Sequence, residues 1–224
     1  MKGKHALVLG ATGATGQELV KILLKDPVFE KVSIFVRRKV DLIHEKLNIH
    51  VIDFIKLEKY KDLVRGDVLF SVLGTTLVDA GSKDKQFLVD FSYQYDFAKI
   101  ASENKVSTLS LVSSLGANEN SLFFYTKIKG KLEQAVKLLN FDNIQIFQPP
   151  YLIRQPELIR SGEKIGVKFF NIVCSFGFFS SFKPISVNVL AFKMIEESKL
   201  AKNNRITIYD PKNIVKLKSI QLNE

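Results

Sequence analysis

A tyrosine and a lysine lie four residues apart in FYTKIKGKLEQAVKLL, residues 124–139. This segment is strongly helical in pattern, so Tyr125 and Lys129 are expected on one helix face, with both polar ends within reach of one ligand. Free tyrosine titrates near ~10, too high for efficient proton transfer at neutral pH, and a neighbouring ammonium lowers that pKa. The pair predicts a tyrosine that works as a general acid or base.

A serine pair precedes this helix. The segment STLSLVSS, residues 107–114, predicts a strand that ends in Ser113 and Ser114. Ligands of parallel α/β sheets lie beyond the carboxyl ends of the strands, where a serine hydroxyl can donate a hydrogen bond to a substrate carbonyl. Each pattern alone is common by chance. A catalytic role therefore depends on whether the fold brings the serine, the tyrosine and the lysine together.

The first such element is a glycine-rich turn, VLGATGATGQEL, residues 8–19, between an apolar strand-like run and a helix-like run. Glycine lets a ligand approach the main chain, and the helix that follows directs its free N–H groups at an anion. The turn predicts a bound dinucleotide pyrophosphate, with a purely steric role of the glycines as the alternative. Its expected cofactor contacts are Gly10, Thr12, Gly13, Ala14, Thr15 and Gly16.

The end of the next strand indicates which dinucleotide is bound. VSIFVRR, residues 32–38, ends in Arg37 and Arg38, where NAD-binding proteins carry an acidic residue for the ribose hydroxyls. A guanidinium can instead grip a 2′-phosphate with two hydrogen bonds. We therefore expect NADP(H) in preference to NAD(H); the alternative is a basic strand end that only faces solvent.

Two further strand ends are expected to touch the cofactor. NIHVIDF, residues 48–54, places Asp53 and Phe54 beside the adenine, and DVLFSVLG, residues 67–74, leads into Leu73, Gly74 and Thr75 on the nicotinamide side.

Strand and helix patterns alternate along the chain, which predicts an α/β protein with a doubly wound parallel sheet, the Rossmann fold. Expected helices include 56–64, 85–104 and 187–198, and further strands are expected at 143–150 and 205–210. We expect one domain, residues 1–224, in which residues 150–200 contribute a small substrate lobe.

Composition excludes several function classes. The 224 residues carry a net charge of +10, but the lysines are spread along the whole chain without a nucleic-acid-binding motif, so no nucleic-acid partner is expected. The single Cys174 allows no internal disulfide and favours the cytoplasm, and the three scattered histidines predict no metal site. No signal peptide is expected, and the aromatic stretch 167–182 is too short and too broken for a transmembrane helix.

These motifs together resemble the short-chain dehydrogenase/reductase superfamily in its extended or atypical form. The stretches VRRK, VLGTT, LVSSLGA, FYTKIKGKLE and FDNIQIFQPPYLI are similar to its Tat-interacting-protein branch, whose members bind NADPH. The resemblance implies that Ser114 contacts the substrate carbonyl, with Ser113 as the alternative, that Tyr125 donates the proton, and that Lys129 also holds the nicotinamide ribose. Where many members carry a relay asparagine, this chain has Asp90-Phe91-Ser92.

The expected function is that of an NADP(H)-dependent oxidoreductase that transfers hydride to a small carbonyl substrate or from the corresponding alcohol. The alternatives are an epimerase or dehydratase of the nucleotide-sugar type, and a regulatory protein that binds NADPH without turning it over. A group of phenylalanines suits an apolar carbonyl compound, or packs the lobe or an oligomer interface such as that of a homodimer; they are Phe169, Phe170, Phe176, Phe178, Phe179 and Phe182.

Overall fold

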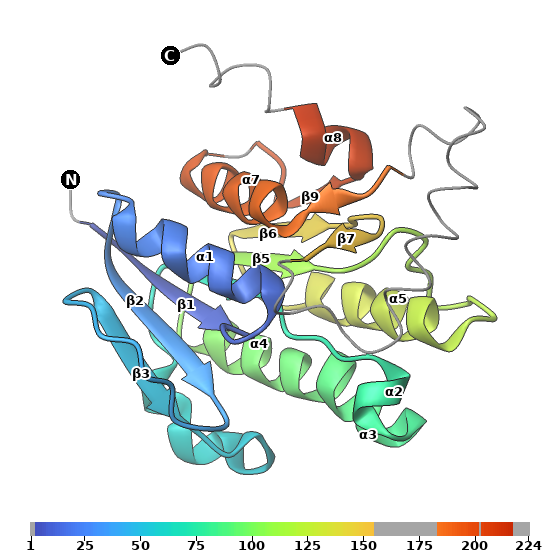
Figure 1. The fold of residues 1–224 in the computed structure, drawn as a ribbon, viewed down its shortest axis with the longest axis horizontal. Coiled ribbons are helices and arrows are strands. Elements are labelled where there is room, and N and C mark those ends of the chain that lie inside the picture. Colours follow the sequence, from blue (N-terminus) through green and yellow to red (C-terminus); the bar gives the residue numbers. More distant parts are fainter. Residues whose placement is uncertain (1–2, 155–182, 202, 217–224) are drawn as a thin grey trace.

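A computed structural model describes residues 3–154, 183–201 and 203–216. Within these ranges, seven parallel strands form one sheet in the order β3-β2-β1-β4-β5-β6-β9 (Figure 1). The strands are β1 (Lys4–Leu9), β2 (Phe29–Val36), β3 (Leu47–Val51), β4 (Val68–Ser71), β5 (Thr108–Val112), β6 (Asn143–Phe147) and β9 (Ile206–Tyr209). The predicted doubly wound α/β fold is confirmed.

Helices cover both faces of this sheet (Figure 1). One layer contains α1 (Ala14–Lys25) and α7 (Val187–Lys199), which pack against each other. The opposite layer contains the 3₁₀ helix η1 (Phe54–Leu63), α4 (Tyr93–Glu103) and α5 (Phe124–Lys137). Smaller elements complete the described chain: α2 (Leu77–Ala80), α3 (Lys83–Phe87), the π-helical turn η2 (Leu88–Ser92), the pair β7 (Leu152–Ile153) and β8 (Ile185–Ser186), and α8 (Pro211–Val215).

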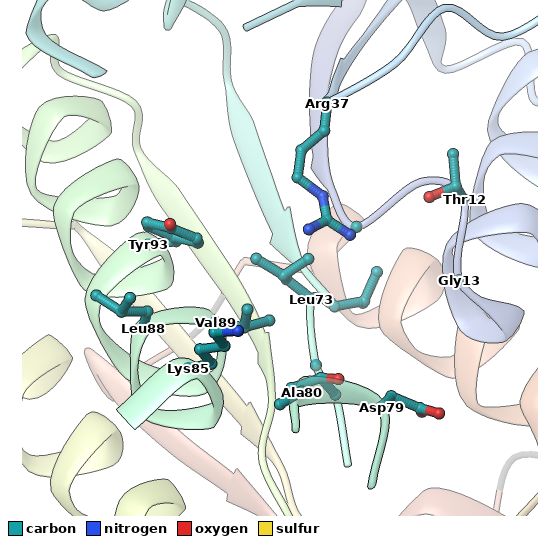
Figure 2. A pocket seen from close by; sticks show the side chains of 14 residues that line it. Thr12, Gly13, Arg37, Leu73, Asp79, Ala80, Lys85, Leu88, Val89 and Tyr93 are labelled. Atoms are coloured by element: carbon teal, nitrogen blue, oxygen red, sulfur yellow. The ribbon is translucent and has the colours of Figure 1, made fainter. Parts of the chain in front are cut away.

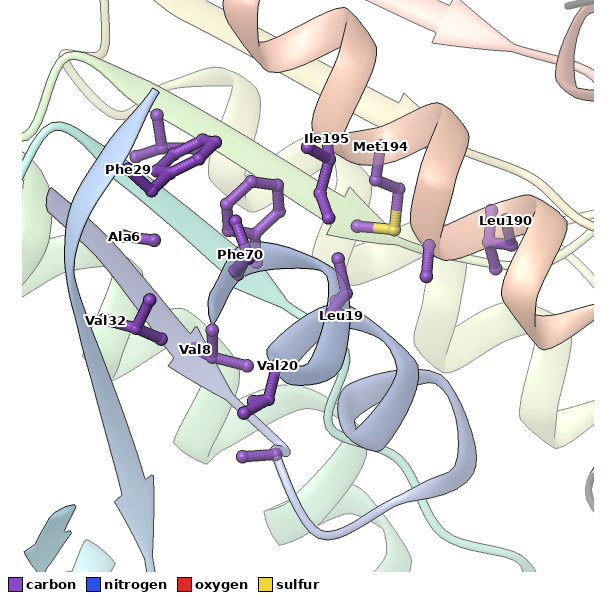
Figure 3. Packing of buried hydrophobic residues seen from close by; sticks show 14 of the residues in the cluster. Ala6, Val8, Leu19, Val20, Phe29, Val32, Phe70, Leu190, Met194 and Ile195 are labelled. Carbon is purple, nitrogen blue, oxygen red and sulfur yellow. The ribbon is translucent and has the colours of Figure 1, made fainter. Parts of the chain in front are cut away.

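Strand β1 shows why the sheet needs two helical layers. Its successive side chains point to opposite faces, so Ala6 and Val8 join one apolar cluster while Leu7 and Leu9 join the other. Figure 3 shows the first cluster, in which Leu19 of α1 and Met194 of α7 meet the strand side chains. The apolar run Ala6–Leu9 of this strand is therefore buried from both sides.

Some element boundaries differ from the sequence prediction. The strand predicted over 48–54 ends at Val51, because the Asp53 side chain accepts a hydrogen bond from the Ile55 amide and caps η1. The long helix predicted over 85–104 is interrupted by the π turn η2. The fifth strand ends at Val112, which leaves Ser113 and Ser114 in the turn that follows it.

The strand order reverses between β1 and β4, which are neighbours although β2 and β3 lie between them in sequence. Their following turns approach closely: Gly10 has a φ of +94°, and a Cβ there would lie 2.6 Å from the Leu73 amide nitrogen. Only glycine meets both requirements without strain. This reversal is the point at which open α/β sheets bind ligands.

The residues predicted to form the aromatic part of a substrate lobe, together with Cys174, lie outside the described residues. From the same 150–200 region, α7 covers the sheet beside α1. The division into a main domain and a lobe stays a prediction. In the part of the chain that the structure describes, no helix combines the length and hydrophobicity that a membrane crossing requires.

Two histidines, on the strands β1 and β3 that flank β2, share one serine of β2. The Ser33 Oγ lies 2.9 Å from His5 Nε2 and 3.3 Å from His50 Nε2. Burial lowers the pKa of His5 to about 4, with Lys31 and His50 acting in the same direction and Asp67 opposing them. Burial, followed by Lys31, also lowers the pKa of His50. Both rings are therefore held in the neutral form.

We expect the protein to lose stability on mild acidification. The folded-state pKa of His5 lies below its ordinary value of 6.5, so the unfolded chain takes up the proton first, and stability falls as the pH drops from about 6.5 towards 4. His5→Asn removes this titration. Between pH 7 and pH 5 the parent should lose about 2–4 °C more in thermal midpoint than the variant, an effect already reduced by solvent screening.

Differential scanning fluorimetry across this pH range measures the effect. His44→Asn is the matched control, because His44 lies outside the serine-bridged pair and should keep the parent's pH dependence. Equal losses in the parent and in His5→Asn would contradict the assignment.

Candidate functional site

The turn after β1 is closed by its own backbone. The Gly13 amide donates to the Gly10 carbonyl over 3.0 Å, and Gly13 is the N-cap of α1 without contributing a side chain to the helix end. A Cβ at Gly16 would come within 2.1 Å of the Gly10 carbonyl oxygen, whereas one at Gly13 would lie 3.4 Å from it. Gly16 therefore packs the helix onto the turn, and Gly13 leaves the helix N-terminus open to an anion.

One cavity lies between this turn and the wall formed by α2, α3, η2 and the first residue of α4 (Figure 2). We call it the Arg37 cavity; its volume is about 480 Å³. Arg37 reaches into it from the end of β2, and Lys85 of α3 comes from the opposite wall. Its lining residues are Gly10, Thr12, Gly13, Arg37, Val72, Leu73, Gly74, Thr75, Asp79, Ala80, Lys85, Leu88, Val89 and Tyr93.

A second cavity of about 660 Å³, the Tyr125 cavity, lies beyond the carboxyl ends of β4 and β5. It shares Gly13 and the Val72–Thr75 segment with the Arg37 cavity, so the two form neighbouring parts of one crevice. Its lining residues are Gly13, Ala14, Thr15, Val72, Leu73, Gly74, Thr75, Val112, Ser113, Ser114, Leu115, Gly116, Tyr125, Lys129, Pro149, Pro150, Tyr151, Leu152, Arg154 and Val187.

The two serines after β5 differ in their contacts. The Ser113 hydroxyl donates to Glu133 Oε1 over 2.5 Å, and Gln148 donates to the same buried carboxylate. The Ser114 Oγ is buried and has no hydrogen-bond partner among the described residues. Since both serines line the Tyr125 cavity, the hydroxyl that remains available to a ligand there is that of Ser114.

Helix α5 contributes the other two members of the predicted trio. Tyr125 is 42% exposed, whereas Lys129 is buried and its Nζ lies 3.3 Å from Asp90 Oδ1. Burial alone lowers the pKa of the Lys129 ammonium, but the charges of Asp90, Tyr125 and Glu133 together raise it above its ordinary value. The cavity wall therefore presents a charged ammonium beside a half-buried phenol.

The structure does not bring every predicted site residue to these cavities. Arg38, Asp53, Phe54 and Gly16 line neither of them. Asp53 caps η1, and Phe54 packs against the Tyr93 ring with centroids 5.4 Å apart. The cofactor contacts predicted for these residues stay predictions.

Several residues that line the two cavities were not predicted from the sequence. Lys85 lies on the short helix α3, before the π turn η2, and Tyr93 begins α4 directly after it, so no single helical period joins the two in the sequence. Tyr151, Arg154 and Val187 reach the Tyr125 cavity from beyond β6. The double proline at residues 149–150, which ends the sixth strand, was the one local signal of a turn at this edge.

No group of three or more His, Cys, Asp or Glu side chains within the described ranges is arranged to hold a metal ion.

A family model described as NAD(P)H-binding matches residues 10–156. The chain belongs to this NAD(P)H-binding family.

Individual relatives agree with this family assignment. The protein HTATIP2 of Rattus norvegicus is 37% identical over 174 residues, covering 76% of this chain and 72% of the relative. The protein FMP52, mitochondrial, of Kluyveromyces lactis is 35% identical over 175 residues, covering 76% of each chain. The predicted resemblance to the Tat-interacting-protein branch is confirmed.

Solved structures support the fold of this NAD(P)H-binding family member. The UDP-N-acetylglucosamine 4-epimerase from Methanobrevibacter ruminantium M1, in complex with UDP-N-acetylmuramic acid, superposes with a TM-score of 0.69 at 17% identity. The match covers 94% of this chain and 77% of that chain. At 17% identity, this similarity supports a shared fold and nothing further.

The two glycines of the turn should respond differently to an added methyl group. Gly16→Ala drives a Cβ into the Gly10 carbonyl, and we expect it to lower the free energy of unfolding by roughly 1–3 kcal/mol. Gly13→Ala, with an ordinary contact at 3.4 Å, should cost less than about 1 kcal/mol and serves as the matched control. Urea denaturation followed by circular dichroism measures both; equal losses would contradict the packing role of Gly16.

Proposed function

We propose that this chain is an NADP(H)-dependent oxidoreductase of the atypical short-chain dehydrogenase/reductase type, which transfers hydride to a small carbonyl substrate or from the corresponding alcohol. One observation carries the proposal: Ser114, Tyr125 and Lys129 line a cavity that continues, through Gly13 and Val72–Thr75, into the cavity of Arg37. A long dinucleotide needs such a continuous crevice, with an anion site near its middle and a reactive group at one end.

The residues present fit a nicotinamide dinucleotide. The open N-terminus of α1 at Gly13 suits the pyrophosphate, because backbone N–H groups and the helix dipole both favour an anion there. The buried Ser114 hydroxyl, which lacks a described protein partner, suits a ligand oxygen. The bound cofactor would supply the hydride.

The chain's own residues then act on the substrate. Ser114 donates a hydrogen bond to the carbonyl oxygen and orients it, and Tyr125 gives its proton to the developing alkoxide. Lys129 holds a positive charge beside Tyr125, which favours the phenolate left after proton transfer. In this scheme Ser113 supports the site through its bond to Glu133.

The preference for NADP(H) over NAD(H) is proposed on charge. Arg37 and Lys85 face the Arg37 cavity from opposite walls, and a 2′-phosphate adds negative charge that both can bind. Arg38 and Lys39 follow on the exposed chain and add to the local positive potential.

Arg37→Ala should weaken NADPH binding at least tenfold, about 1.4 kcal/mol, because it removes a charge-assisted contact to the 2′-phosphate. NADH binding should change by less than about twofold, since NADH lacks that phosphate. Fluorescence titration of both cofactors measures the ratio. Arg65→Ala, which removes an exposed charge paired with Asp62, controls for net charge. An unchanged ratio in Arg37→Ala/Arg38→Ala would contradict the proposed preference.

Tyr125→Phe should reduce the rate of NADPH oxidation with aldehydes and ketones by roughly 10²–10⁴-fold, because it removes the proton donor. NADPH affinity should stay within about twofold of the parent. Tyr95→Phe is the matched control, since Tyr95 stacks on Phe91 and lines neither cavity. A panel of small carbonyl compounds assayed at 340 nm measures the effect.

The same panel separates the alternatives. Tight NADPH binding without oxidation by any carbonyl, and without an effect of Tyr125→Phe, favours a regulatory cofactor-binding protein. Interconversion of nucleotide sugars without net NADPH consumption favours an epimerase or dehydratase. Either outcome would contradict the proposed oxidoreductase.

The proposed location is the cytoplasm, on the ground that a single cysteine suits a reducing compartment. The relatives named as mitochondrial proteins make the mitochondrion the alternative. A homodimer likewise stays a proposal.

A further inference from the structure

Asp90 is a fully buried carboxylate in the π-helical turn η2, between α3 and α4. Placing an ionised carboxylate out of water is costly unless it is paired and hydrogen-bonded. Single π turns inside helices are rare and occur often at functional sites, because the extra residue redirects side chains. The buried position of Asp90 therefore costs free energy, which its interaction partners must offset.

Those partners lie on the walls of both cavities. The Lys129 Nζ lies 3.3 Å from Asp90 Oδ1, and both side chains are buried. The Thr75 amide donates to Asp90 Oδ2 over 3.3 Å. A Cβ on Gly74 would lie 3.2 Å from Oδ1, so the turn after β4 packs closely on the carboxylate. Asp90 thus joins α5 to the segment that the two cavities share.

A second layer of hydrogen bonds fixes the π turn itself. The Gln94 side-chain amide donates to the Asp90 carbonyl oxygen over 3.0 Å, and its own oxygen accepts from the Ser71 hydroxyl over 2.9 Å. Since Ser71 is the last residue of β4, the turn is tied to the sheet edge that carries the site. The carboxylate has little freedom to move away from Lys129.

The charges that face Lys129 come from two elements. Asp90 approaches from η2, and Tyr125 and Glu133 lie one helical turn away on α5 in either direction. Burial lowers the pKa of Lys129, whereas Asp90, Tyr125 and Glu133 raise it. Asp90 contributes the largest of these favourable interactions and the only ion pair that Lys129 forms within the described residues.

We propose that Asp90 is a positioning residue, whose carboxylate holds the Lys129 ammonium in the wall of the Tyr125 cavity and ties it to the turn after β4. The inference rests on the proposed function, because Lys129 is the group that supports Tyr125 there. Asp90 thereby takes a task different from that of the relay asparagine that the resemblance implies at this helix. Removing the carboxylate takes from a buried ammonium its largest favourable interaction, which favours loss of its proton.

The test measures Lys129 directly in the protein without cofactor. NMR of protein carrying lysine labelled with ¹³C at Cε follows each ammonium with pH, and Lys129→Met assigns the signal. In Asp90→Asn, an uncharged side chain of the same shape, Lys129 should release its proton at a pH at least one unit lower than in the parent. Asp96→Asn, which removes an exposed carboxylate of α4, is the matched control and should leave the Lys129 titration unchanged.

Cofactor binding gives a second readout. Over the pH range in which Lys129 of Asp90→Asn loses its proton, the affinity of this variant for NADPH should fall at least fivefold more than that of the parent, and this excess should vanish in Asp90→Asn/Lys129→Met. A merely structural role of Asp90 would not create a pH dependence that requires Lys129.

The outcomes separate the two proposals. An unchanged Lys129 titration in Asp90→Asn overturns the positioning role whether or not NADPH binds, whereas a parent that binds no NADPH but shows the shifted titration counts against the proposed function alone. If Asp90→Asn does not fold, Asp90→Asn/Lys129→Met, which removes both charges, should restore folding. A double variant no more stable than the single one would overturn the inference.

Discussion

The close approach of two backbone turns is the constraint on which this site depends. Gly10 adopts a φ of +94° and lies so near Leu73 that a Cβ would collide with its amide, while Gly16 lies against the Gly10 carbonyl. These contacts bring the turn after β1, the N-terminus of α1 and the turn after β4 to one point. A side chain at Gly10 or Gly16 would push these backbone segments apart.

The crevice has a different electrostatic character at its two ends. At the Arg37 cavity, exposed cations from the end of β2 and from α3 face open space, where they suit a mobile, multiply charged phosphate. At the Tyr125 cavity the ammonium of Lys129 is buried and already paired with a carboxylate. The first arrangement suits the attraction of an anionic ligand, whereas the second holds one charge in a fixed place beside the Tyr125 phenol.

Two buried networks of polar side chains lie at the wall of the Tyr125 cavity. Glu133 accepts hydrogen bonds from Ser113 and Gln148, and Asp90 pairs with Lys129. Buried carboxylates tolerate displacement poorly, because an unpaired charge away from water is costly. These networks therefore limit the positions that Ser114, Tyr125 and Lys129 can take.

Much of this arrangement follows from the sequence by itself. The glycine spacing, the alternation of strand and helix patterns and the helical spacing of Tyr125 and Lys129 are local features, governed by backbone sterics and by the helical period, and they predicted the fold and the dinucleotide crevice. Only the tertiary structure decided that the Ser113 hydroxyl is engaged by Glu133 while that of Ser114 has no partner among the described residues, that Arg37 rather than Arg38 lines the crevice, and that Asp90 reaches Lys129. Each of these depends on packing between segments far apart in the chain. The contact of Asp90 depends also on a π turn, whose extra residue interrupts the regular helical period.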